Sequence, residues 1–223
     1  MCGLTAGICT AVYSNIAATA AVPSEQLRTI VLDAGHGGED GGTASAAGVL
    51  EKDVNLAITL RLKALLQAAG FTVKMVRDTD VAVNDDGLGT LAQRKVSDIK
   101  NRLKLLKSTP NSIFVSIHQN HFPQTQYHGT QVFYSSNHPQ SEQLAQAIQT
   151  AVVTHLQTEN TRQIKPSGSS IYLLKHAQTP AVLVECGFLS NPEEAARLTD
   201  SIYQGQMAFS VFCGILRYLQ TAG

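Results

Sequence analysis

Short apolar runs rich in β-branched residues alternate along the chain with segments whose apolar residues recur at helical spacing. The apolar runs predict buried strands, and they lie at Thr29–Asp33, Phe71–Val76, Ser112–Ile117, Gly129–Tyr134, Ser170–Leu174 and Ala181–Val184. The segments between them predict helices from Glu51 to Gly70, over Leu91–Lys107, over Pro139–Leu156, from Asn191 onward and over Ile202–Leu219. This alternation predicts a single α/β domain with a mostly parallel (mixed), twisted sheet of about six strands, covered by helices on both faces.

Two of these helices carry clear boundary signals. Gly70 follows the last apolar position of the helix that Glu51 heads, as a glycine often does at a helix end. Asn191 precedes a proline and two glutamates, the pattern of an N-cap, a first-turn proline and acids near the positive end of the helix dipole.

Composition narrows the function classes without naming one. Of the 223 residues 43% are hydrophobic and 15% are charged, with 17 basic against 17 acidic residues, whereas about 25% charge is average. Such a chain is too apolar for intrinsic disorder, and its zero net charge argues against a nucleic-acid partner held by phosphate contacts. The four cysteines include no CxxC pair, so neither a zinc ribbon nor a disulfide framework is indicated.

The first 24 residues carry no charged side chain. They are small and apolar, and Ala18-Thr19-Ala20 resembles the small-residue cleavage site of an export signal, although the usual basic start is missing. We expect residues 1–24 to be a signal peptide or an N-terminal membrane tether, and residues 27–221 to form the catalytic domain. The protein is then exported, and touches the membrane only through this segment.

Three predicted strands are followed, at once or within three positions, by an ionisable residue. His36 follows the first strand, His118 follows the run 112–117, and Glu185 follows the run 181–184. Ligands bind outside the carboxyl ends of strands in open α/β sheets, so these side chains are expected to converge on one site. Glu51 heads a helix that starts near the same edge, and Asn120, two residues beyond His118, is a weaker candidate for substrate contact.

Each residue also has a simpler interpretation. His36 sits among glycines in a loop, and a lone glutamate such as Glu51 often serves only the helix dipole. The glycines around His36 match neither GxGxxG nor a P-loop, and no HExxH helix is present. Together, however, two histidines and a carboxylate are the ligands of many catalytic zinc sites, and hydrolysis then needs a further carboxylate to move protons. Spacing alone leaves open which of Glu51 and Glu185 has which role.

Four blocks of sequence resemble the motifs of the zinc-dependent N-acetylmuramoyl-L-alanine amidases, the type-3 amidase family. The blocks are IVLDAGHGGEDGG (30–42), LEKDVNLAITLRL (50–62), FVSIHQNHF (114–122) and VLVECGFLSNPEEA (182–195). The resemblance extends over residues 29–219 in the order of the family. It implies that His36, Glu51 and His118 bind one Zn²⁺ ion and that Glu185 is the catalytic residue.

The implied reaction is hydrolysis of the amide between the lactyl group of N-acetylmuramic acid and L-alanine in peptidoglycan. The segments KVSDIKNRLKLL (95–106) and KPSGSSIYLLK (165–175) resemble the germination-specific, spore-cortex branch of the family, which implies action in the cell envelope or at the spore cortex. Gln119 stands where the family commonly has a small residue, and we expect it to alter packing rather than metal binding.

Two alternatives of other classes remain open. A zinc peptidase acting on the stem peptide would use a similar metal site, and a non-catalytic relative would bind peptidoglycan or regulate another protein. The presence of all four residues that the resemblance assigns to metal binding and catalysis favours the amidase. An accessory protein partner, the preference for cortex or vegetative wall and the oligomeric state are not determined by the sequence.

Overall fold

The computed structural model describes residues 29–221, so the predicted signal or tether at residues 1–24 lies outside the described part. Among the described residues, no helix is long and apolar enough to cross a membrane. The elements are β1 (Thr29–Ala34), α2 (Glu51–Ala68), β2 (Val73–Met75), α3 (Leu91–Lys107), β3 (Ser112–Asn120), β4 (Gln131–Tyr134), α4 (Gln140–His155), β5 (Lys165–Pro166), α5 (Tyr172–His176), β6 (Ala181–Phe188), α6 (Pro192–Thr199) and α7 (Ser201–Thr221).

The sheet has six strands in the order β2-β1-β3-β6-β4-β5. Strands β2, β1, β3 and β6 run parallel, whereas β4 is antiparallel to β6 and β5 follows the direction of β4. The predicted α/β fold with a mixed, mostly parallel sheet is therefore confirmed. Because β4 is reversed, the start of β4 meets the carboxyl ends of β3 and β6 at one edge of the sheet.

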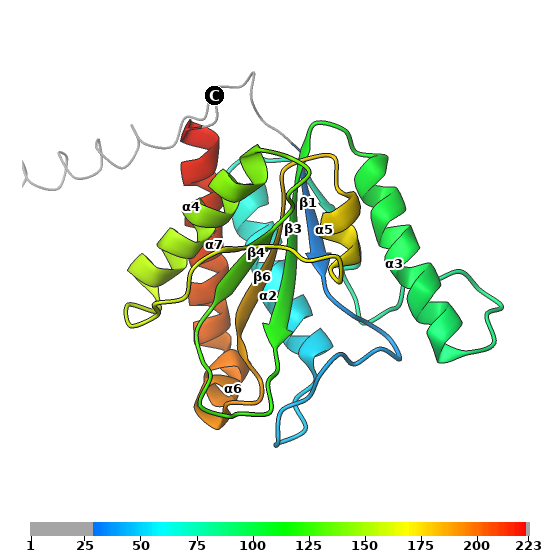
Figure 1. The fold of residues 1–223 in the computed structure, drawn as a ribbon, viewed down its shortest axis with the longest axis horizontal. Coiled ribbons are helices and arrows are strands. Elements are labelled where there is room, and N and C mark those ends of the chain that lie inside the picture. Colours follow the sequence, from blue (N-terminus) through cyan, green and yellow to red (C-terminus); the bar gives the residue numbers. More distant parts are fainter. Residues whose placement is uncertain (1–28, 222–223) are drawn as a thin grey trace, which may run out of the picture.

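Helices cover both faces of this sheet, as Figure 1 shows with α3 and α5 on one side and α4 and α7 on the other. On the larger face α2, α4 and α7 bury alternate residues of the central strands, such as Ile113, Val115 and Ile117 of β3. On the opposite face α3 and α5 pack on residues such as Val31 and Phe114. Strand residues therefore alternate between two cores, and the polar residues of the strands interrupt the second core near the carboxyl edge.

The helix predictions match closely. Helix α3 spans the predicted residues, and Asn191 caps α6 by accepting hydrogen bonds from the backbone N–H groups of Glu193 (3.0 Å) and Glu194 (3.1 Å). Gly70, just beyond α2, has a φ of 90°, a conformation that glycine adopts without strain.

One predicted strand is wrong. The run Ser170–Leu174 does not join the sheet; its second half belongs to α5, which lies over the sheet with Leu173 and Leu174 both buried. The sixth strand is instead β5, a two-residue edge strand that contains Pro166.

Strands β3 and β6 are longer than predicted, and this extension positions the site. Both His118 and Glu185 lie within their strands and are direct register partners. A bulge between His118 and Asn120 then shifts the pairing of the last residues of β3. The side chains of His118 and Glu185 are therefore held by the sheet itself rather than by loops.

Candidate active site

The loop that carries His36 is held by two buried arginines. Arg77 donates hydrogen bonds to the carbonyl oxygens of Ala34 (2.8 Å) and Gly35 (3.0 Å). Arg102 donates to those of Ala34 (3.0 Å) and His36 (2.7 Å). His36 itself has a φ of 63°, which is uncommon for a residue other than glycine. These contacts fix the backbone of the loop and stabilise that conformation.

Arg102 also forms a buried ion pair at the base of the site. Its guanidinium contacts Asp33 at 2.5 Å, and both side chains are nearly inaccessible to solvent. Ser116 donates a hydrogen bond to the other oxygen of Asp33 at 2.6 Å. Burial alone would raise the pKa of Asp33, but Arg102, His118 and Ser116 together outweigh it and hold the pKa below its usual value.

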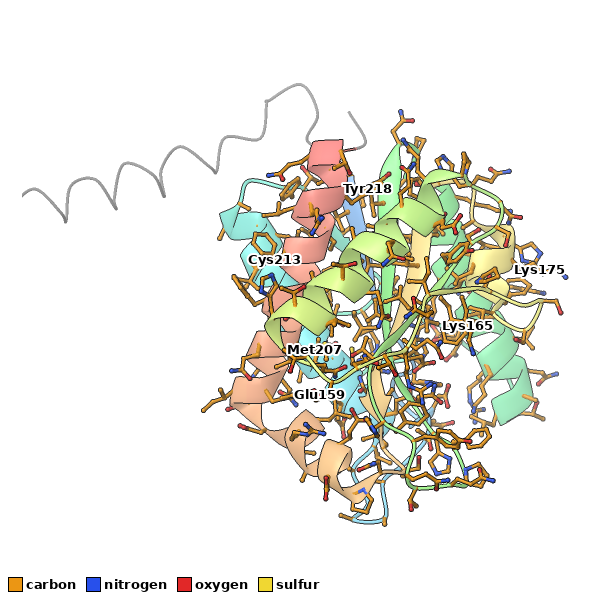
Figure 2. The ribbon with its side chains drawn as sticks, turned by 60° about the vertical axis from the view of Figure 1, so that its left-hand side comes forward. Glu159, Lys165, Lys175, Met207, Cys213 and Tyr218 are labelled. Atoms are coloured by element: carbon orange, nitrogen blue, oxygen red, sulfur yellow. The ribbon has the colours of Figure 1, made fainter. Side chains whose placement is uncertain are left out.

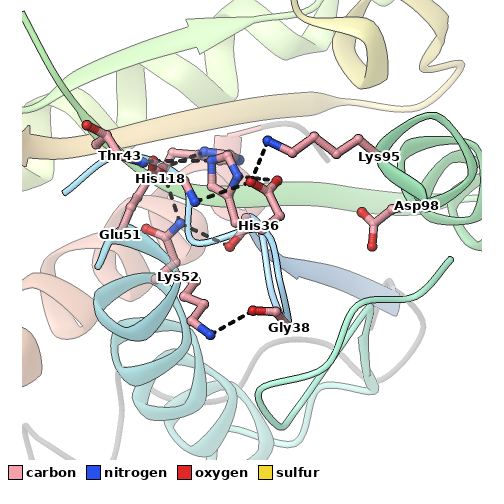
Figure 3. A network of polar contacts seen from close by, with 12 residues as sticks. His36, Gly38, Thr43, Glu51, Lys52, Lys95, Asp98 and His118 are labelled. Atoms are coloured by element: carbon pink, nitrogen blue, oxygen red, sulfur yellow. Dashed lines mark hydrogen bonds and ion pairs between the residues drawn. The ribbon is translucent and has the colours of Figure 1, made fainter. Parts of the chain in front are cut away.

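His36, Glu51 and His118 meet at the carboxyl edge of the sheet (Figure 3). The Nε2 atom of His36 lies 3.2 Å from Oε2 of Glu51, and the Nδ1 atom of His118 lies 3.0 Å from Oε1 of Glu51. One potential ligand atom from each residue lies within 4.8 Å of the other two. Three residues far apart in the sequence thus present two imidazoles and a carboxylate to one point.

Backbone and amide groups orient the Glu51 carboxylate. The backbone N–H groups of Thr43 (3.0 Å) and Gln119 (3.1 Å) donate to its two oxygens, and Asn55 donates from one turn further along α2 (3.3 Å). Burial raises the pKa of Glu51, but hydrogen bonds and charge from His118 and His36 dominate and hold it far below its usual value. Glu51 is therefore ionised at neutral pH.

His36 is oriented on its other side by an acid. Its Nδ1 atom lies 2.8 Å from Oδ2 of Asp40, and Lys95 contacts the second oxygen of Asp40 at 2.8 Å (Figure 3). Burial of the ring opposes protonation, but Glu51 and Asp40 together raise the pKa of His36 to about 9. A carboxylate on the second nitrogen of a histidine is the usual support for a metal-binding imidazole.

Two glycines make the close packing of these side chains feasible. A Cβ atom on Gly35 would lie 2.3 Å from ring atoms of His118, and one on Gly42 would lie 2.5 Å from Oε2 of Glu51 and 2.7 Å from the His36 ring. Gly42 also has a φ of 69°. The glycines after the first strand therefore serve the side chains of the site.

Glu185 projects beside this cluster from the neighbouring strand. Its Oε2 atom is buried and has no hydrogen-bond partner among the described residues. Burial raises the pKa of Glu185 to about 7, the nearby His118 lowers it, and Glu51 adds to the rise. A buried carboxyl with a pKa near neutrality suits a group that accepts and returns a proton. The adjacent Cys186 points into the opposite core, and burial raises the pKa of its thiol well above its usual value, which excludes a reactive thiolate there.

The donor set fits a tetrahedral divalent metal. Ligands bonded to zinc at about 2.0–2.1 Å in tetrahedral geometry are roughly 3.3 Å apart. Each histidine nitrogen lies close to this distance from one Glu51 oxygen, His36 at 3.2 Å from Oε2 and His118 at 3.0 Å from Oε1. Three protein ligands also leave a fourth position open for water or substrate. This donor chemistry, together with the buried Glu185 beside it, fits zinc.

The remaining sequence candidates lie close to this cluster. Asn120 ends β3 just beyond the bulge and is partly exposed. Gln119 points away from His118 toward α2, where its amide donates to Asn55 at 3.1 Å, so it alters packing and leaves the metal donors in place. Asp40 was not predicted, although an acid four residues after a candidate metal-binding histidine was a usable signal. Asp33 and Arg102 gave no such signal, because only the fold brings them together.

A cleft opens over the cluster on the side of α3. Its volume is about 370 Å³, and its lining includes His36 and His118 together with apolar residues Leu91, Ile99 and Leu173. The cluster is therefore accessible from solvent.

A donor set that could hold a metal ion, with a buried carboxylate beside it at the carboxyl edge of an α/β sheet, is the arrangement typical of metal-dependent hydrolases. A sequence model of the N-acetylmuramoyl-L-alanine amidase family matches residues 30–217. The chain therefore belongs to the N-acetylmuramoyl-L-alanine amidase family. The activity that follows is hydrolysis of the amide between N-acetylmuramic acid and L-alanine in peptidoglycan.

Individual relatives agree with this assignment. The chain is 38% identical, over 88% of its length and 81% of the relative, to the germination-specific N-acetylmuramoyl-L-alanine amidase of Bacillus subtilis. Among solved structures it is similar to the CwlD amidase of Clostridioides difficile in complex with the GerS lipoprotein, with a TM-score of 0.84, 40% identity and coverage of 86% of this chain and 98% of that one. Another N-acetylmuramoyl-L-alanine amidase, from Clostridium difficile 630, has a TM-score of 0.75 at 29% identity, covering 89% and 100%.

Proposed function

We propose that the chain is a zinc-dependent amidase in which His36, Glu51 and His118 hold one Zn²⁺ ion and Glu185 is the catalytic acid and base. The observation that carries this proposal is the convergence of three donor atoms within 4.8 Å beside a buried carboxyl oxygen that has no hydrogen-bond partner in the part of the chain that the structure describes. Glu51 is already engaged by both histidines and three donors, which suits a fixed ligand rather than a mobile proton carrier.

The chemistry divides between the metal and the protein. Bound zinc supplies Lewis-acid polarisation of the scissile carbonyl and of the attacking water. Glu185 accepts the proton of that water and returns it to the departing alanine nitrogen, because its pKa near 7 allows both steps at neutral pH. Asp40 holds the His36 ring in the orientation that presents Nε2. Asn120, at the end of β3, is placed to contact substrate.

We further propose that the enzyme acts on spore-cortex peptidoglycan outside the cytoplasmic membrane. The similarity to a germination-specific amidase supports this substrate, and residues 1–24 then act as a signal peptide or tether. The similar CwlD amidase forms a complex with a lipoprotein, which supports an accessory protein partner for this chain as well.

The test is product analysis with matched variants. Glu185→Gln is expected to retain zinc, measured by elemental analysis, and to lose about 10²–10⁴-fold in turnover, whereas His36→Ala loses zinc and turnover together. Glu193→Gln, an exposed residue of α6, is the matched control and is expected to behave as wild type.

Mass spectrometry of digested peptidoglycan separates this proposal from its alternatives. New free lactyl ends identify the amidase, shortened stem peptides identify a peptidase, and bound but unchanged peptidoglycan identifies a binding protein or an enzyme that awaits its partner. Full turnover by Glu185→Gln would refute the role assigned to Glu185.

A further inference from the structure

A second groove lies on the other side of Glu185 from the α3 cleft. Its lining includes Tyr127, Gln131, Asn160, Arg162, Gln163 and Lys165. Gln131 begins β4 and is the register partner of Glu185 in the antiparallel pair. Residues directly opposite each other in such a pair project from the same face, with Cα atoms roughly 4.5–5.5 Å apart. The groove therefore begins one strand away from the catalytic carboxylate.

The groove is cationic. Its lining contains Arg162 and Lys165 and no aspartate or glutamate. Within residues 29–221, neither of these two side chains forms an ion pair. Lys165 is exposed in the edge strand β5 (Figure 2).

Arg162 is held in place without being neutralised. Its Nε donates to the carbonyl oxygen of His128 at 2.6 Å and Nη1 lies 3.4 Å from the Gln131 side-chain oxygen. The guanidinium also stacks over the ring of Phe188, 4.5 Å from its centroid. A guanidinium oriented in this way retains its charge and a free edge for a planar anion such as a carboxylate.

The α3 cleft is different in this respect. Its arginines and lysine, Arg94, Lys95 and Arg102, are paired with Glu39, Asp40 and Asp33 at distances of 2.5–2.8 Å. No cation there is left without an acid, so that cleft suits an uncharged part of the substrate.

We infer that the Arg162–Lys165 groove binds the peptide half of the substrate and recognises the α-carboxylate of the glutamate that follows L-alanine in the stem peptide. This inference rests on the proposed amidase function. An extended peptide covers roughly 7 Å in two residues, more than the roughly 4.8 Å between neighbouring strands. A stem peptide that starts beside Glu185 therefore reaches past Gln131 of β4 toward Arg162, whose Nη1 lies 3.4 Å from the Gln131 side-chain oxygen. The N-acetylated sugar, which carries no charge once its lactyl group is amidated, then occupies the α3 cleft.

The experiment measures binding of two muramyl dipeptides that differ only at this group. One is N-acetylmuramoyl-L-alanyl-D-glutamate and the other is its α-amide, the D-isoglutamine compound. Titration of the metal-free protein, followed by NMR or calorimetry, avoids turnover. The acid is expected to bind about 10–100-fold more tightly than the amide, the range for a hydrogen bond to a charged group.

Substitutions in the groove test which residues cause the preference for the acid over the amide. Arg162→Gln is expected to reduce the difference between acid and amide to less than about twofold while affinity for the amide stays close to wild type; Arg162→Lys retains part of the preference, and Lys165→Gln lowers it by less. Arg217→Gln makes the same change on an exposed arginine of α7 and is expected to leave the preference intact. In the zinc-loaded enzyme the preference appears in KM rather than in kcat.

Several results would overturn the inference. They are equal affinity of the wild type for both compounds, a preference that survives Arg162→Gln, and an absence of binding by the metal-free form of a preparation whose zinc-loaded form releases lactyl ends from peptidoglycan. If Arg162→Gln unfolds, as its melting temperature reports, Arg162→Lys and Lys165→Gln decide the question. Loss of lactyl-end release in the wild type would instead refute the amidase function itself.

Discussion

Protons are expected to compete with the metal at His36. The pKa of His36 is raised to about 9 in the metal-free site, so this imidazole is mostly protonated at neutral pH. A histidine must lose its proton before it can bind a metal. Lowering the pH therefore weakens metal binding, and raising it toward 9 strengthens binding.

The size of this pH effect on zinc affinity follows from the pKa of His36. At pH 7, two units below it, about one molecule in 100 has a neutral His36, so the apparent affinity for zinc is about 100-fold below its limiting value, or about 2.7 kcal/mol. Between pH 7 and pH 9 the affinity is expected to rise about tenfold per unit. Glu51 adds nothing to this slope because it is ionised throughout the range.

Competition with a chelator of known zinc affinity, at several pH values, measures this slope. Calorimetry in buffers of different ionisation enthalpy should show about one proton released per zinc at pH 7. Asp40→Asn removes one of the groups that raise the pKa. The variant should therefore show a flatter slope, and an affinity at pH 9 lower by about 10–100-fold.

Glu39→Gln changes the neighbouring acid, which is paired with Arg94 and is not among the groups that raise the pKa of His36. It should leave the slope unchanged. An affinity that is constant from pH 7 to pH 9, without proton release, would show that His36 is neutral in the metal-free site and would refute the reasoning.

Three further substitutions test packing and charge. Gly35→Ala places a methyl group 2.3 Å from the His118 ring, so zinc content should fall well below one ion per chain; full zinc loading would contradict the close approach. Arg102→Met leaves Asp33 buried without its ion-pair partner. Urea denaturation should show the free energy of unfolding lowered by about 3–5 kcal/mol, and a loss under about 1 kcal/mol would argue against a buried pair. Gly214→Ala puts a Cβ 2.5 Å from the α4 backbone and should lower the free energy of unfolding by about 1–3 kcal/mol, measured as a lower melting temperature. An unchanged melting temperature would mean that α4 and α7 adjust freely.

The helices and central strands could be predicted because their signals are local. Helix α3 combines apolar spacing with Thr90, whose side chain forms a capping box with Gln93. The run Ser170–Leu174 misled the prediction because a five-residue apolar stretch fits a buried strand and a short helix equally well. Its position on the α3 side of the sheet decides the outcome, and no local pattern encodes that position. The two-residue strand β5, with its proline, is also beyond such patterns.

The site was predictable to the extent that each residue stands next to an apolar run. His36, His118, Glu185 and Glu51 all follow or begin predicted elements, and the parallel sheet brings such positions to one edge. The residues that support the site by hydrogen bonds have no such local signal in the sequence. Gly129 and Phe188 donate backbone hydrogen bonds to the buried Glu194, which the sequence suggested only as a first-turn acid of α6.

The reversed direction of β4 determines where the chain can accept insertions during evolution. Both ends of the connection from β3 to β4, residues 121–130, emerge at the catalytic edge. Doubling the length of a flexible loop costs only about 0.6 kcal/mol in closure entropy, and neither core includes this segment. Insertions here would lengthen a rim over the active site while leaving the sheet register intact. The fold therefore provides a place, within the exposed residues 121–128, where access to His36, Glu51 and His118 can evolve with little cost to stability.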